Sequence, residues 1–179
     1  YQVEIPTITK DVFTYDGTEK DIGLNRTDFY DVSGTKATNA GTYSAVILLL
    51  DTDNLEWTDK TSGNKTIGWK IEKATVGLTI PQNKSFTYNG TEQTLQFESS
   101  NYYSVSGNTG TNAGNYTATV SLTDANNYSW DDGSSENITI DWTIGKQSIT
   151  VPVPTSTTYT YNGTPIVLSI SFTDNISLT

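Results

Sequence analysis

A segment of 73 residues occurs twice in succession, and this repeat constrains the possible fold more than any other feature. Residues 1–73 align with residues 74–146 without a gap, and 29 positions are identical. The sequences FTYDGTE at 13–19 and FTYNGTE at 86–92 mark the same place in both copies. Because each copy of such a repeat folds as one structural unit, we expect two equivalent modules: module 1 (residues 1–73) and module 2 (residues 74–146).

A third copy begins directly after module 2. Residues 159–165 read YTYNGTP, one further step of 73 residues along the chain. Residues 147–179 are therefore expected to form an incomplete third module, which would pack against module 2 or take strands from a neighbour. On this interpretation the chain is a fragment of a longer array.

Alternation of apolar and polar side chains predicts the strands of both modules. Residues 43–49 place Tyr43, Ala45, Ile47 and Leu49 on one face, and residues 116–122 repeat the pattern. Residues 67–71 and 138–144 alternate in the same way, which places Trp69 and Trp142 in the core. Shorter strands are expected at 3–5, 12–15, 20–24 and 29–33, and no stretch has helical periodicity. This pattern predicts an all-β fold of tandem small antiparallel β-sandwiches.

The segment Asn39-Ala40-Gly41-Thr42-Tyr43 favours an immunoglobulin-like sandwich. In that fold a tyrosine near the start of strand F donates its hydroxyl proton to an upstream backbone carbonyl. Tyr43 and Tyr116 would be these corner residues. The tryptophan expected on strand C is missing, so a β-grasp-like module stays open as the alternative.

Composition excludes several functional classes. The chain has no cysteine and no histidine, so it lacks the ligands of thiolate metal sites and the commonest general base. Its net charge of −10 excludes the basic surface of a nucleic-acid-binding protein. No run of 18 apolar residues is present, so membrane insertion is not expected. We expect an extracellular protein that is not an enzyme and needs no cofactor.

The combined motifs resemble a known family of surface modules. FTYDGT, SG…TNAGTY, NY.W.DG and TI.WTI.K are similar to the MBG/YDG-type modules of bacterial cell-surface proteins, chiefly from Firmicutes and their relatives. The resemblance implies modules in strings that act as stalks or adhesive surfaces, or modules that decorate a phage virion. Module 1 departs from module 2 at Leu55, which replaces Tyr128, and at Lys60, which replaces Gly133, so the resemblance does not determine the shape of its last loop.

Loop aromatics are the first candidate binding residues. Trp57 and Trp130 lie in the long connection before the last strand, and Tyr128 lies beside Trp130. A large apolar ring is suited to close the end of a small core, so we expect the tryptophans to act as plugs. The alternative is that Trp57, Trp130 and Tyr128 bind a host glycan or protein.

Acidic loops are the second candidate. Carboxylate oxygens suit Ca²⁺, and calcium at module junctions would stiffen an array. The candidate ligands are Asp51, Asp53, Asp124, Asp131 and Asp132. No EF-hand spacing is present, and Asp/Asn-rich turns also arise because these side chains hydrogen-bond to the following backbone.

The sequence thus predicts a structural stalk or spacer segment of an extracellular surface protein or adhesin, whose partners are neighbouring modules of the same chain. Two other functions remain open: a carbohydrate- or protein-binding module, and a virion decoration module.

Overall fold

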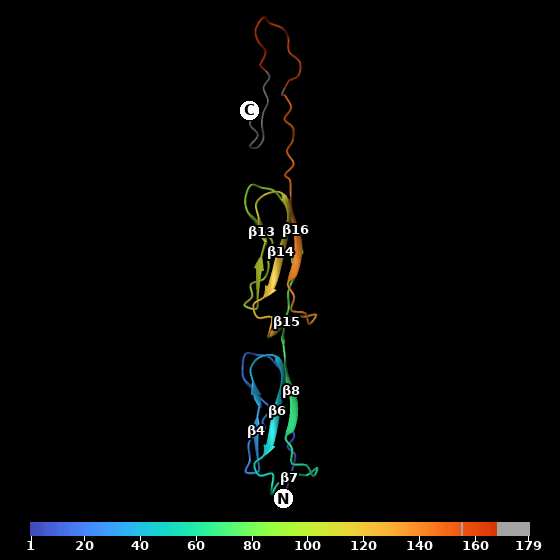
Figure 1. Cartoon of the computed structure of the whole chain (residues 1–179). Coiled ribbons are helices and arrows are strands. Elements are labelled where there is room, and N and C mark those ends of the chain that lie inside the picture. Colours follow the sequence, from blue (N-terminus) through green and yellow to red (C-terminus); the bar gives the residue numbers. More distant parts are fainter. Residues whose placement is uncertain (155, 168–179) are drawn as a thin grey trace.

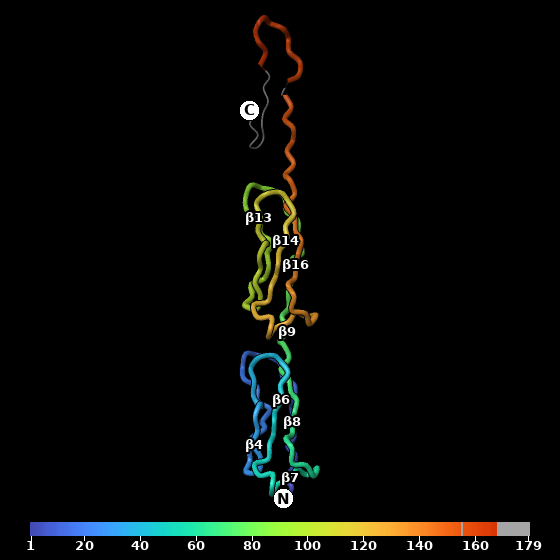
Figure 2. The backbone as a smooth tube through the Cα atoms, viewed as in Figure 1, coloured from blue at the N-terminus to red at the C-terminus, as the bar shows by residue number. Residues whose placement is uncertain are grey.

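The computed structural model describes residues 1–154 and 156–167, and its regular structure consists of β-strands without any helix in these residues. Modules 1 and 2 lie end to end along one axis (Figures 1 and 2). The N-terminus lies at the outer end of module 1, and the chain after module 2 leaves from the opposite end of the rod. In the part of the chain that is described, no helix is long and apolar enough to cross a membrane.

The main sheet of module 1 has four strands, in the order β2 (Val12–Thr14), β8 (Lys65–Glu72), β6 (Gly41–Leu49) and β4 (Tyr30–Ser33). Strand β6 pairs antiparallel with both β4 and β8. The two longest strands, β6 and β8, are those with the clearest alternation of apolar and polar side chains.

Two pairings in module 1 are parallel, which corrects the expectation of an antiparallel module. Strand β2 runs parallel to β8, and β1 (Gln2–Val3) runs parallel to β7 (Glu56–Trp57). Alternation shows that a strand is half buried but gives no information on the direction of its partner. Parallel partners need a long connection, which the intervening strands of the module provide here.

The core of module 1 combines side chains of the main sheet with side chains of the shorter strands and of the segment after β3 (Lys20–Asp21). A two-stranded antiparallel pair, β3 and β5 (Lys36–Ala37), completes the strand set. Ile22 and Leu24, which follow β3, are buried with side chains of the main sheet. The buried core consists of Val3, Ile22, Leu24, Ala45, Ile47, Leu49, Trp57, Trp69 and Ile71.

Module 2 has the same strand pairings at positions 73 residues further on. Its main sheet has the order β10-β16-β14-β12, with two two-stranded sheets, β11-β13 and β15-β9. The strands are β9 (Ala74–Val76), β10 (Ser85–Thr87), β11 (Gln93–Thr94), β12 (Tyr103–Ser106), β13 (Thr109–Gly110), β14 (Gly114–Leu122), β15 (Tyr128–Trp130) and β16 (Ile138–Gly145). Val12 pairs with Lys70 in module 1, and Ser85 pairs with Thr143 in module 2.

The loop after β7 has the same backbone path in both modules, although the residues differ. The amide of Lys60 donates to the Trp57 carbonyl at 2.9 Å, and the amide of Gly133 donates to the Trp130 carbonyl at the same distance. Lys60 has a φ of 66° and Gly133 has a φ of 82°. The loop of module 1 therefore keeps the shape of the module 2 loop, because Lys60 adopts the left-handed conformation that glycine adopts more easily.

The described residues after module 2 form no strand, and residues 155 and 168–179 lie outside the described part of the chain. Among the described residues after position 146, no side chain belongs to the core of module 2, and Val151 and Val153 are exposed. In this described part, packing of the third copy against the core of module 2 is thus not observed. Strand exchange with a neighbour is not tested, since part of the third copy lies outside the described residues.

Candidate functional site

Trp57 and Trp130 close the cores of their modules. Their exposed fractions are 0% and 3%. Each indole N–H donates to a backbone carbonyl of its own module at 2.7 Å, Gly63 for Trp57 and Glu136 for Trp130. A buried ring whose polar atom is satisfied internally has no face for a ligand, so the geometry favours the expected role of core plugs over the alternative of ligand-binding residues. They also lie in strands β7 and β15 rather than in an irregular connection.

Tyr43 and Tyr116 connect a surface turn to the core. The Tyr43 hydroxyl donates to the Asn39 carbonyl, and the Tyr116 hydroxyl donates to the Asn112 carbonyl, both at 2.7 Å. Each tyrosine packs on a buried tryptophan, with ring centroids 4.8 Å apart for Tyr43–Trp69 and 4.6 Å apart for Tyr116–Trp142. The Asn-Ala turns at the C-terminal end of each module are thereby held by the core.

The tryptophans Trp69 and Trp142 also fix a backbone turn. Their indole N–H groups donate to the carbonyls of Gly34 and Gly107 at 3.0 Å. Gly34 has a φ of +70°, and a Cβ atom at this position would lie 2.3 Å from the Ser44 carbonyl oxygen. Glycine is therefore required here both by conformation and by the close approach of β6.

Asp51 and Asp124, two of the acidic candidates, accept hydrogen bonds from residues of their own loops. The Asp51 carboxylate accepts hydrogen bonds from the Asp53 and Asn54 amides and from the Asn54 side chain, and Asp124 does the same with Asn126 and Asn127. These bonds, above all the one from the asparagine side chain, lower the pKa of both carboxyl groups.

The remaining acidic candidates do not gather around a common point. Asp132 accepts a hydrogen bond from the Ser134 amide at 2.8 Å. Neither Asp53 nor Asp131 joins a group of three acidic side chains with metal-binding geometry, and no such group occurs in residues 1–154 and 156–167. The described geometry therefore favours turn formation as the role of these acidic residues.

The two modules meet through a very short connection. Lys73 is the single residue between β8 of module 1 and β9 of module 2. The Lys73 ammonium group donates to the Ala125 carbonyl at 2.7 Å and to the Ser135 hydroxyl at 2.8 Å, and both partners belong to module 2. The connection between the main sheet of module 1 and the β9–β15 pair is thus held by side-chain contacts as well as by the peptide chain.

Asn127 is the main polar contact at this junction. Its Oδ1 accepts the Ala40 amide proton at 2.8 Å, and its Nδ2 donates to Asn39 Oδ1 at 3.3 Å. The same Nδ2 donates to Asp124 Oδ2 at 2.7 Å, and the residue is only 6% exposed. Since the Asn39 carbonyl accepts the Tyr43 hydroxyl, a continuous series of hydrogen bonds joins the core of module 1 to the first acidic loop of module 2.

Tyr128 supplies the apolar contact at the junction. Its ring lies edge-on to Tyr15 of module 1, with centroids 5.4 Å apart, and 5.0 Å from the ring of Tyr102. Partial burial raises the pKa of the Tyr128 phenol, since desolvation disfavours the phenolate. A residue considered as a ligand contact thus packs against the neighbouring module, where aromatic pairs prefer this edge-to-face geometry.

The sequence predicts a short junction at Lys73–Ala74 that limits bending, but its pattern does not reveal the side-chain contacts there. Asn127 was one Asn among many, and the TNAG segment was interpreted only as a corner turn. A signal was nevertheless present, because Asn54/Asn127 and Asn39-Ala40/Asn112-Ala113 are identical in both copies although they lie outside the alternating strands. Polar identities at the ends of a repeat are the expected sign of contacts between its copies.

No protein-family model matches the chain, and no curated protein matches its sequence.

Proposed function

We propose that modules 1 and 2 form a stiff, non-catalytic spacer segment of an extracellular surface protein, in which each module is an immunoglobulin-like sandwich. The observation that carries this proposal is the junction. A one-residue connection, the buried Asn127 and the Tyr15–Tyr128 contact restrict rotation of one module against the other. Domains joined without such contacts move relative to each other by default.

Several features support the fold within this proposal. The hydrogen bonds from Tyr43 and Tyr116 to upstream carbonyls have the geometry of the tyrosine corner of immunoglobulin-like domains. The resemblance of FTYDGT, TNAGTY and the Trp130 loop to MBG/YDG-type modules supports the surface location. The net charge of −10 favours solubility and mutual repulsion along an extended array.

A distance measurement across the junction tests the spacer function. The chain contains no cysteine, so Thr66→Cys and Thr139→Cys, at exposed equivalent positions of the two main sheets, accept spin labels without side reactions. Double electron–electron resonance should give one narrow distance distribution. Asn127→Ala should widen it, because the Ala40 amide then loses its acceptor. A broad distribution in the otherwise unchanged chain would contradict a stiff spacer.

A further inference from the structure

We infer that the N-terminal end of module 1 is a docking face for the C-terminal end of another module of this repeat. This inference rests on the proposed spacer function. The docking face is defined here by Tyr1, Phe29, Asp51, Asn54 and Leu55. The occupant would present a Tyr-Asp/Asn-Gly turn and an Asn-Ala-Gly turn, as module 1 presents to module 2. The inference follows from the correspondence between this face and the one by which module 2 meets module 1.

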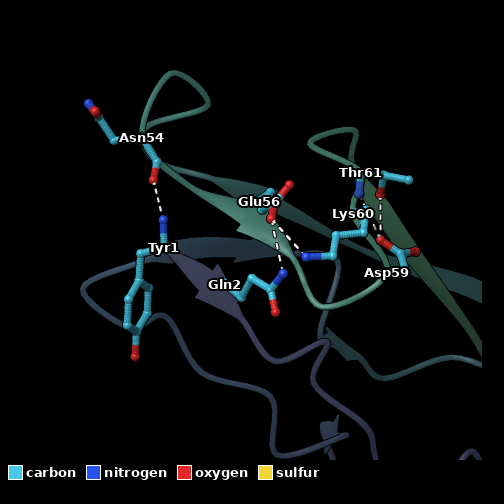
Figure 3. Close-up of polar contacts among 7 residues, drawn as sticks. All are labelled: Tyr1, Gln2, Asn54, Glu56, Asp59, Lys60 and Thr61. Carbon is cyan, nitrogen blue, oxygen red and sulfur yellow. Dashed lines mark hydrogen bonds and ion pairs between the residues drawn. The ribbon is translucent and has the colours of Figure 1, made fainter.

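The first correspondence is the path of the backbone. The Tyr1 amino group donates to the Asn54 carbonyl at 2.8 Å (Figure 3). The Ala74 amide donates to the Asn127 carbonyl at 2.9 Å. Gln2 pairs with Glu56 as Thr75 pairs with Ser129. The chain therefore enters module 1 in the same position and direction in which it enters module 2 from Lys73.

The second correspondence is the asparagine that makes the polar contact. Asn54 Nδ2 donates to Asp51 Oδ2 at 2.8 Å, which matches the bond of 2.7 Å from Asn127 to Asp124. The Asn54 side chain points away from the β1–β7 pair in Figure 3, and no described residue donates a hydrogen bond to its Oδ1. In module 2 the equivalent oxygen accepts the Ala40 amide proton. Asn54 is thus held in the orientation that docking uses, with its acceptor free.

The third correspondence is an apolar surface beside this asparagine. Tyr1 stacks on Phe29 with ring centroids 5.2 Å apart, and Phe29 is 41% exposed. Phe29 and Leu55 occupy the positions of Tyr102 and Tyr128, and at the junction the Tyr128 ring packs on both Tyr102 and Tyr15. A hollow of about 410 Å³ adjoins Phe29 and is lined in part by Tyr1, Val3, Pro6 and Tyr30. An aromatic ring in the place of Tyr15 would cover this surface.

The complementary surface is present at the other end of the rod. Tyr88, Asn112 and Ala113 of module 2 correspond to Tyr15, Asn39 and Ala40 of module 1. Tyr88 is 38% exposed, whereas Tyr15 is partly covered by Tyr128. The Tyr116 hydroxyl already holds the Asn112 carbonyl at 2.7 Å, so this turn has its docked conformation without a partner.

The test adds one copy of residues 1–73 ahead of Tyr1 in the full chain, so that Lys73 of the added copy is followed by Tyr1. Spin labels at Thr66→Cys in the added copy and in module 1 report on the new junction. The labels at Thr66→Cys and Thr139→Cys in a second sample report on the original junction. We expect distance distributions of equal width. Asn54→Ala should widen the distribution at the new junction only, and Asn127→Ala that at the original junction only.

The outcomes separate this inference from the proposed function. A broad distribution at the new junction beside a narrow one at the original junction would overturn the docking face and leave the spacer function intact. Broad distributions at both junctions would overturn both. A narrow distance distribution at the new junction that Asn54→Ala leaves unchanged would overturn the role given to this face, provided that the heteronuclear NMR spectrum shows a folded variant.

Discussion

Module 1 and module 2 share a frame but differ in how their surfaces are built. The frame consists of the buried tryptophans, the turns that hydrogen-bond to a tyrosine hydroxyl, and the loops that hydrogen-bond to an aspartate carboxylate. All of these features recur at a step of 73 residues. The ion pairs found in the described residues all lie within module 1, between positions 16 and 72. The fold is therefore maintained by packing and hydrogen bonds, while surface charge is free to change.

The ends of the two modules show a second difference. Asn127 is buried against module 1, whereas Asn54, in the same loop and with the same aspartate partner, is exposed. The comparison separates what an asparagine contributes to its own loop from what it contributes to the contact between modules.

The largest expected effect concerns the buried tryptophans. Trp57→Ala and Trp130→Ala should each lower the free energy of unfolding of their own module by about 3–5 kcal/mol, because each leaves a large cavity in a small core. Hydrogen exchange followed by mass spectrometry resolves the two modules. A change well below this range in either module would contradict the role of the rings as core residues.

The junction asparagine should give the next largest effect. Asn127→Ala should cost about 1–3 kcal/mol, because the Ala40 amide loses a buried acceptor. Asn54→Ala is the matched control, since it removes the same hydrogen bonds within the loop but no contact with a neighbouring module. Chemical denaturation of both variants gives the comparison. Equal losses would show that Asn127 stabilises its loop and contributes nothing to the junction.

The loop after β7 and its counterpart after β15 allow the residues at one equivalent position, Lys60 and Gly133, to be exchanged between the modules. Lys60→Gly should stabilise module 1 by about 1 kcal/mol, and Gly133→Lys should destabilise module 2 by a similar amount, because a left-handed φ is costly for a residue with a Cβ atom. The exposed pair of Lys60 with Glu56, 3.5 Å apart, adds little. Thermal unfolding of both variants tests the exchange, and two changes of the same sign would refute it.

The smallest expected effect is a difference between the two modules in their stability at acidic pH. The Lys20 ammonium and the Thr18 side chain hold the pKa of Asp16 well below its usual range, and the Gly23 amide lowers the pKa of Asp21. Module 2 has Asn89 and Thr94 at these positions. Because the folded pKa values are depressed, the contribution to stability is present above about pH 4 and is lost as the pH falls through the folded values.

Hydrogen exchange at a series of acidic pH values measures this difference. Module 1 should lose protection before module 2, and Asp16→Asn should reduce the gap between them. High salt is the control, since it screens exposed pairs. A greater acid sensitivity of module 2 would contradict this assignment.

Much of each module could be predicted from residue order, whereas the contacts between modules could not. Alternation predicted inward side chains along 43–49, and Ala45, Ile47 and Leu49 are buried. The parallel pairing of β2 with β8 escaped prediction because periodicity carries no direction. Ala40 and Asn127 are 87 residues apart, and no local pattern reports on a contact over that distance.

Residual dipolar couplings of backbone amides test the central claim most directly, namely that the two modules form one stiff rod. Couplings from residues 1–73 and 74–146 of the full chain, measured in one aligned sample, define an alignment tensor for each module. The junction of Lys73, Asn127 and Tyr128 predicts a common tensor of equal magnitude and orientation. Two tensors of different magnitude would show that the modules reorient independently and would contradict the account.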